Sequence, residues 1–115
     1  MATKNEVRDR AAEYLGIKQL NQALQTQDST RILSAYTEVY NQLEKDGLAT
    51  FASDGTIPDE LAPHIAYLMA DNCKDSYAVS DTRYNRIVRG SENADREIRK
   101  LITSDYKSGE EPTDY

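Results

Sequence analysis

The sequence contains a single cysteine, Cys73, and a single histidine, His64, among its 115 residues. One cysteine excludes a disulfide within the chain and a metal cage built from several thiolates. One histidine excludes a metal site that needs two imidazole ligands from this chain. We therefore expect no bound metal and no cofactor.

Long apolar runs are also missing. No stretch approaches the roughly 20 apolar residues that a transmembrane helix requires, and the charged N-terminal stretch lacks the pattern of a secretory signal peptide. We therefore expect no contact with a membrane. Basic residues are in the minority, with 14 Lys and Arg against 20 Asp and Glu and a formal net charge of −6. This balance disfavours general affinity for nucleic acids, because phosphate binding requires Lys and Arg.

Tryptophan is absent and phenylalanine occurs once, whereas tyrosine occurs eight times. Tyrosine combines a large apolar body with a hydroxyl group, and it is enriched where proteins contact proteins. A chain of 115 residues forms one domain with a small core. The apolar fraction of 38% is low for a globular domain, so a partner can cover part of the apolar surface.

Apolar residues recur with a helical period along most of the chain. This period predicts an all-α fold, a small bundle of about four helices that span about residues 4–15, 29–46, 59–77 and 81–103. Polar residues, proline and glycine mark the expected helix ends. They are a capping box from Thr3 to Glu6, a C-terminal stop at Gly16, N-caps at Asp28 and Ser80, and Pro58 in the first turn of the third helix.

Two features interrupt the helical pattern. Residues 50–57 contain the turn sequence Ser53-Asp54-Gly55-Thr56, in which Gly55 supplies a positive φ. The segment is predicted to form either a short turn or a tiny hairpin between its flanking residues. Gly90 lies in the middle of the fourth predicted helix, where glycine costs about 1 kcal/mol relative to alanine.

The last twelve residues, 104–115, have no apolar period and are predominantly acidic. Such a segment cannot bury enough surface to order itself, so we expect a flexible acidic C-terminal arm after a helical domain over residues 1–103. Tyr106, Pro112 and Tyr115 are anchor-type residues within this arm. They are typical of a segment that becomes ordered when it binds a partner.

The residues that usually carry catalysis do not form a recognisable set. His64 and Cys73 lie nine residues apart on one predicted helix, about 13 Å by helical rise, which is too far for a nucleophile and its base. No carboxylate pair in an apolar setting and no glycine-rich phosphate loop is present. We therefore expect Cys73 to be a small core residue, His64 to be partly buried or on the surface, and the protein to have no catalytic residues.

The fourth predicted helix is rich in arginine. Arg83, Arg86 and Arg89 repeat every three residues, Arg96, Arg99 and Lys100 follow, and four acidic residues are interleaved with them. A solvated helix face, a surface for an acidic protein partner and a DNA-binding surface all fit this pattern. Arginine in place of lysine favours bidentate recognition of carboxylates or phosphates, so the first three arginines are candidate partner-binding residues.

Three stretches of the sequence resemble a known family over roughly residues 10–102. They are Ala12-Glu13-Tyr14-Leu15-Gly16, then Ile32-x-x-Ala35-Tyr36-x-x-Val39-x-x-x-Leu43-x-x-x-Gly47-Leu48, and Ile57-Pro58-x-x-x-x-Pro63-x-Ile65-x-x-Leu68-x-Ala70-Asp71. Together they resemble the small helical head-to-tail adaptor proteins of tailed bacteriophages, also called head-completion, connector or tail accessory proteins. The C-terminal segment SDYKSGEEPTDY resembles the extended arms of these proteins.

The resemblance implies a structural protein of the virion neck. Family members are helical bundles that assemble as a homo-oligomeric ring, typically of about twelve copies, beneath the portal protein. The ring extends the channel through which genomic DNA passes and offers a platform to the tail or to the next neck protein. We expect the net negative charge to let DNA pass without specific binding.

Two other functions remain open from the sequence. A small helical DNA-binding regulator would use the arginine-rich fourth helix to contact DNA, and its binding would depend steeply on salt. A muralytic neck enzyme would need an exposed catalytic carboxylate, which the sequence does not nominate.

Overall fold

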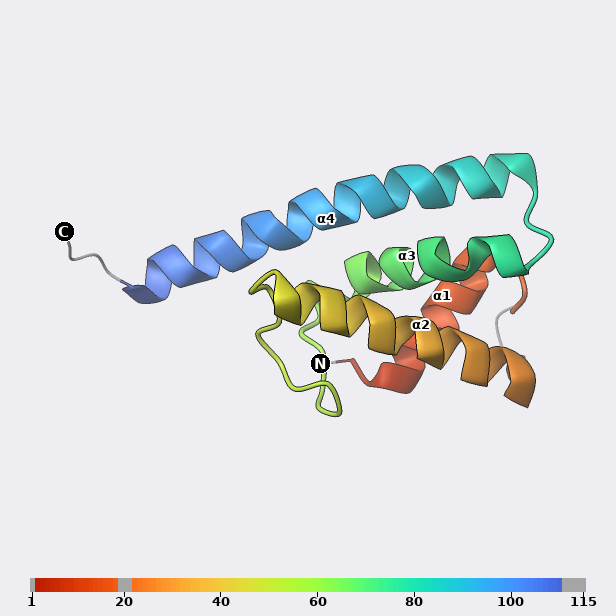
Figure 1. The fold of residues 1–115 in the computed structure, drawn as a ribbon, viewed down its shortest axis with the longest axis horizontal. Coiled ribbons are helices and arrows are strands. Elements are labelled where there is room, and N and C mark those ends of the chain that lie inside the picture. The colour runs from red at the N-terminus through yellow and green to blue at the C-terminus, as the bar shows by residue number, and fades with distance from the viewer. Residues whose placement is uncertain (1, 19–21, 111–115) are drawn as a thin grey trace.

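The computed structural model describes residues 2–18 and 22–110, with side chains described as far as Ile102. The predicted small all-α bundle is confirmed (Figure 1). Its elements are the helices α1 (Lys4–Leu15), α2 (Thr26–Lys45), α3 (Ala62–Cys73) and α4 (Asp81–Glu110), with the short 3-10 helix η1 (Lys74–Ser76) after α3.

Helix α1 has the bounds and the caps that its sequence predicts. The Glu6 amide donates to the Thr3 hydroxyl at 3.1 Å, and the Thr3 amide donates to the Glu6 carboxylate at 2.8 Å. This reciprocal pair is the expected capping box and satisfies two amides that have no partner inside the helix. Gly16 ends the helix with φ 82°, a left-handed conformation that glycine adopts without steric cost.

Helix α2 begins three residues earlier than the sequence predicts. Its N-cap is Gln25, which makes no side-chain cap hydrogen bond, so the predicted N-cap at Asp28 is wrong. Asp28 instead lies in the first turn, where its negative charge interacts favourably with the helix dipole. The helix ends at Lys45, and Gly47 follows with φ 75°.

Helix α3 is shorter than the predicted span of 59–77. The Pro58 carbonyl accepts hydrogen bonds from the amides of Leu61 and Ala62, so Pro58 belongs to a turn that precedes the helix. Pro63 takes the early helical position instead. After Cys73 the backbone tightens into η1, a common way for a helix to end.

Of the two alternatives predicted near residues 50–57, the short turn is present, since the amide of Gly55 donates to the Ala52 carbonyl, and the tiny hairpin does not form. Ile57 instead forms an isolated antiparallel bridge with Ala2, with amide-to-carbonyl distances of 2.8 and 2.7 Å. The Ile57 side chain is fully buried, and this burial holds its backbone against the N-terminal segment. Gly55 does not adopt the predicted positive φ.

Helix α3 lies at the centre of the bundle and packs against α1, α2 and α4. The core side chains come from all four helices and from the 48–61 segment. The largest of those that are completely buried are Tyr36, Ile32, Ile57, Ile65, Met69, Ile87 and Ile98.

Helix α4 is the longest element and crosses one side of the bundle, with its C-terminal part projecting past the other helices (Figure 1). Its 30 residues correspond to about 45 Å of rise, most of the 52 Å long axis of the molecule. The predicted end at residue 103 is therefore wrong by seven residues, because the first seven residues of the predicted arm are helical. Tyr106 lies on this part of α4, and Pro112 and Tyr115 lie outside the described residues.

Candidate interaction surfaces on both sides of helix α4

The three arginines predicted to bind a partner do not share one environment. Arg83 is half-buried, and its guanidinium donates to the carbonyl oxygens of Glu13 and Tyr14 at 3.2 and 3.4 Å. These carbonyls belong to the last turn of α1, where acceptors lack partners within the helix. Arg83 therefore stabilises the α1–α4 contact.

Arg86 and Arg89 are exposed and line a groove between α3 and α4 with a volume of about 640 Å³. We call it the cationic groove. None of its lining residues is acidic, and these residues are Pro63, His64, Tyr67, Thr82, Asn85, Arg86, Arg89, Gly90 and Asn93.

The polar side chains of the cationic groove are available to a ligand. Arg86, Arg89 and Asn93 make no hydrogen bond or ion pair with any other residue that the structure describes, and the same holds for His64 and Asn85. Guanidinium groups without internal partners are well suited to bidentate contacts with carboxylates or phosphates.

The Tyr67 ring in the wall of the cationic groove is closely packed on both sides. The ring of Tyr67 stacks on that of Tyr14, with centroids 4.0 Å apart and an interplanar angle of 13°. On α4, a Cβ atom at Gly90 would lie 2.4 Å from the Tyr67 ring. Gly90 therefore allows α4 to approach α3 closely, which the sequence did not indicate.

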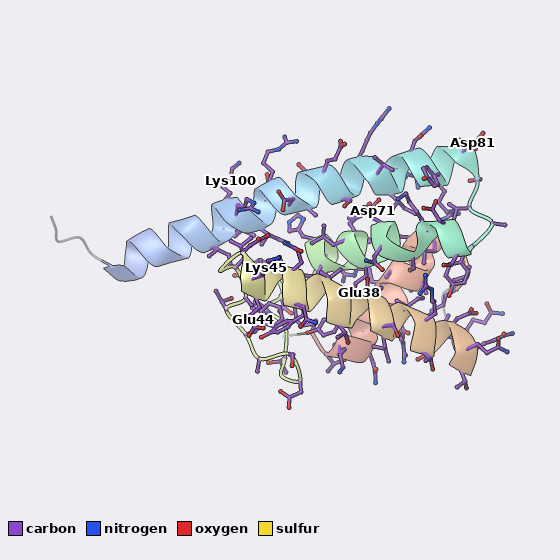
Figure 2. All side chains as sticks on the ribbon, viewed as in Figure 1. Glu38, Glu44, Lys45, Asp71, Asp81 and Lys100 are labelled. Atoms are coloured by element: carbon purple, nitrogen blue, oxygen red, sulfur yellow. The ribbon has the colours of Figure 1, made fainter. Side chains whose placement is uncertain are left out.

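A second groove, about 310 Å³ in volume, lies among α2, α3 and α4. We call it the acidic groove because four carboxylates line it and no basic residue does. Figure 2 labels two of these residues, Glu38 on α2 and Asp71 on α3. The full lining consists of Glu38, Val39, Gln42, Leu43, Asp46, Leu68, Asp71, Asn72 and Asp95.

The carboxylates of the acidic groove have partners at its margin. Lys74 pairs with Asp71 at 2.8 Å, and Arg99 contacts Asp46 and Asp95 at 3.4 and 3.2 Å. The fourth carboxylate, Glu38, accepts a hydrogen bond from Asn72 at 3.1 Å. Four carboxylates and two neighbouring cations leave an excess of two negative charges.

The cationic side chains also continue along α4 beyond the groove. Arg86, Arg89, Arg96 and Lys100 are exposed, and their spacings of three, seven and four residues place them on one face of the helix. We call this set the α4 cationic stripe. The buried α4 residues Ile87, Ala94 and Ile98 occupy a different face, so α4 packs on the bundle through one face and presents these four cations on another. Lys100 also pairs with Glu97 at 3.6 Å.

The tyrosines with described side chains serve the fold. Tyr36 and Tyr40 donate to the carbonyl oxygens of Ser53 and Phe51 at 3.2 and 2.7 Å. These bonds attach the 48–57 segment to α2. Two further hydroxyls, those of Tyr77 and Tyr84, donate to Asp28 and Asp75 at 3.3 and 3.2 Å. The abundance of tyrosine is thus explained largely by internal contacts.

Cys73 is a buried core residue, as its position on an apolar stripe indicates. Its exposed fraction is 1%, its thiol donates to the Met69 carbonyl at 3.2 Å, and burial raises the pKa of the thiol. His64 is half-buried and lies in the wall of the cationic groove.

Sequence reasoning found Arg86 and Arg89 from their periodicity but missed the residues opposite them. Tyr67 and His64 face α4 only because α3 and α4 pack against each other. The acidic groove was missed for the same reason, since its carboxylates come from three helices. Two features of the sequence could have pointed to the acidic groove. Glu38 and Gln42 are spaced i, i+4 and so share a helix face, and charged residues are expected to be exposed.

Within residues 2–18 and 22–110, no cluster of three or more His, Cys, Asp or Glu side chains is arranged to hold a metal ion. Over the same part of the chain, no helix combines the length and apolar character needed to cross a membrane. No protein-family model, curated protein or solved structure matches this chain.

Proposed function

We propose that this protein is a head-to-tail adaptor of a tailed bacteriophage, located in the virion neck. In this proposal, copies assemble as a ring beneath the portal protein, typically about twelve of them. The ring extends the DNA channel and provides the platform for the tail or a further neck protein. The protein acts by binding and performs no catalysis.

The observation that carries this proposal is the exposed arginine pair on α4. Arg86 and Arg89 have no partner among the described residues, and they sit beside a Tyr67 ring held by stacking. A binding surface that is held rigid before contact loses little conformational entropy on association. The projecting end of α4 adds support, because it can reach past the bundle (Figure 1).

The proposal is tested by native mass measurement of the protein with and without the cognate portal ring. We expect a monomer or a loose oligomer to become a ring of fixed stoichiometry on the portal. A failure to associate with the portal under mild salt would contradict the adaptor function.

The α4 cationic stripe favours a second candidate, a small DNA-binding regulator. Four cations on one face of a helix match the need to neutralise phosphates along a duplex. A fluorescent duplex is titrated with the protein at two salt concentrations. The regulator requires an affinity that falls steeply with salt, by roughly one power of concentration per phosphate contacted, whereas the adaptor requires little binding at either concentration.

A further inference from the structure

We propose that the cationic groove of one copy binds the acidic groove of a second copy, and that this contact joins neighbouring copies of the protein. The inference rests on the proposed function, because it names the partner of the same arginine pair. It assigns Arg86 and Arg89 to contacts between copies rather than to contacts with the portal.

The two grooves lie on different sides of α4. The cationic groove includes Arg89 and Asn93, whereas the acidic groove includes Asp95. Asp95 follows Asn93 by two residues, which is a rotation of about 200° around the helix. One copy can therefore present its cationic groove to one neighbour and its acidic groove to another at the same time.

The charges of the two grooves are complementary. Arg86 and Arg89 give the cationic groove two positive charges with no acidic lining residue. The acidic groove keeps an excess of two negative charges after Lys74 and Arg99 are included. A protein of net charge −6 repels its own copies at long range, so a close contact between copies is favoured where its positive surface meets its negative surface.

The two grooves also have similar lengths. The α4 residues that line the cationic groove run from Thr82 to Asn93, which corresponds to about 16 Å of helical rise. The lining of the acidic groove along α2 runs from Glu38 to Asp46, the residue that caps the C-terminus of this helix, or about 12 Å. The α2 edge of one copy can therefore lie along the α4 edge of the next.

A contact between two different faces is heterologous, and it repeats from copy to copy. Such contacts produce a ring when the rotation closes and a filament when it does not. Because the pairs are exposed, each is weak and is screened by salt. Free copies are therefore expected to associate at low salt and to separate as the salt concentration rises.

The test is a charge exchange followed by sedimentation velocity at about 50 mM and about 500 mM salt. Electrostatic attraction is weakly screened at the lower concentration and strongly screened at the higher one. One variant carries Arg86→Glu and Arg89→Glu, and a second carries Glu38→Lys and Asp95→Lys. We expect wild-type copies to associate at the lower salt and each variant alone to associate at least about tenfold more weakly. We expect a mixture of the two variants to recover association.

A control variant with Arg31→Glu and Lys45→Glu changes the net charge by the same amount as the first variant. Both residues are exposed and line neither groove, so this variant is expected to associate like the wild type. Circular dichroism of each variant verifies that the helices are intact.

The proposal is overturned if the wild type stays monomeric at low salt and near-millimolar concentration, or if the mixture of variants does not recover association. Salt-independent association would also overturn it. The portal experiment is separate, because self-association through the two grooves without portal binding would reject the adaptor function and retain this interface. A ring that forms on the portal as readily with the Arg86→Glu, Arg89→Glu variant as with the wild type would reject the interface and retain the function.

Discussion

At the residue scale, the close approach of α3 and α4 explains why position 90 is occupied by glycine. Helix propensity alone would favour alanine at this position by about 1 kcal/mol. In the folded protein an added Cβ would lie 2.4 Å from the Tyr67 ring, and the stacked Tyr14 ring restricts how far Tyr67 can move. The packing constraint therefore outweighs the local propensity.

We predict that Gly90→Ala lowers the free energy of unfolding by about 1–3 kcal/mol, the usual cost of overpacking a contact between elements. Urea denaturation followed by circular dichroism measures the change. The matched control is Asn93→Ala on the exposed face of α4, which should be neutral or slightly stabilising. An increase in stability for Gly90→Ala would show that Tyr67 moves aside at little cost.

Arg83 and Arg86 are neighbours on α4 but differ in their contacts, so their contributions to stability can be compared. Arg83 donates to two carbonyl oxygens at the end of α1, whereas Arg86 has no such contact among the described residues. We predict that Arg83→Met lowers the free energy of unfolding by about 1–2 kcal/mol and that Arg86→Met changes it by less than about 0.5 kcal/mol. Thermal unfolding of both variants tests this difference, and equal effects would contradict the separate roles.

At the scale of the element, the core residues of α4 whose side chains are described lie between Ile87 and Ile102. Its buried residues are Ile87, Ala94 and Ile98, with Leu101 and Ile102 half-buried. The helix nevertheless continues to Glu110. The described core contacts of α4 thus end about two turns before the helix does.

We predict that deletion of residues 104–115 leaves the bundle folded, with a change in unfolding free energy of less than about 0.5 kcal/mol, and weakens attachment to the portal. The deletion removes seven helical residues, so the helical circular dichroism signal should fall only by the share that these residues contribute to the total helix content. The comparison is deletion of residues 98–115, which removes buried Ile98 and should cost several kcal/mol. Loss of most of the helical signal in the shorter deletion would contradict this prediction.

The helix ends that the sequence predicts correctly are those that depend only on neighbouring residues. The capping box at Thr3 and the stop at Gly16 involve only neighbouring residues, so they could be predicted correctly. The sequence misplaces the starts of α2 and α3. Asp28 and Pro58 are residue types that favour a helix start, but Asp28 lies inside the first turn of α2 and Pro58 lies in a turn that precedes α3. Asp28 accepts a hydrogen bond from Tyr77, 49 residues away, and no pattern near Asp28 could indicate this.

At the scale of the whole molecule, several titrating groups share one direction of shift. Burial, and then the negative charge of Asp28, raise the pKa of Tyr77 to about 12 from its ordinary value of 10.0. Burial also raises the pKa values of Tyr14 and Tyr36. The pKa of Lys74 is raised by its hydrogen bond to Asp71. In each case the folded protein holds the proton more tightly than the unfolded chain.

We predict that stability falls as the pH rises from about 9 toward about 12, because the buried Cys73 thiol, with an ordinary pKa of 9.0, and these tyrosines keep their protons to higher pH in the folded protein. The sign follows because unfolding releases protons in this range, so a higher pH favours the unfolded chain. Denaturation midpoints measured across the alkaline range test the prediction. Tyr77→Phe should reduce the slope, because it removes the most strongly shifted of these groups, and a slope unchanged by this substitution would contradict the assignment.

The sequence by itself determined the fold class, the number of long helices and the arginine periodicity. These depend on the spacing of apolar and charged residues along one helix, which is a local property. Tertiary structure decided the pairing of Ile57 with Ala2, the separation of Arg83 from Arg86 and Arg89, and the two grooves beside α4. Each of these depends on which helices pack together and how closely, and such contacts join residues that are distant in the chain.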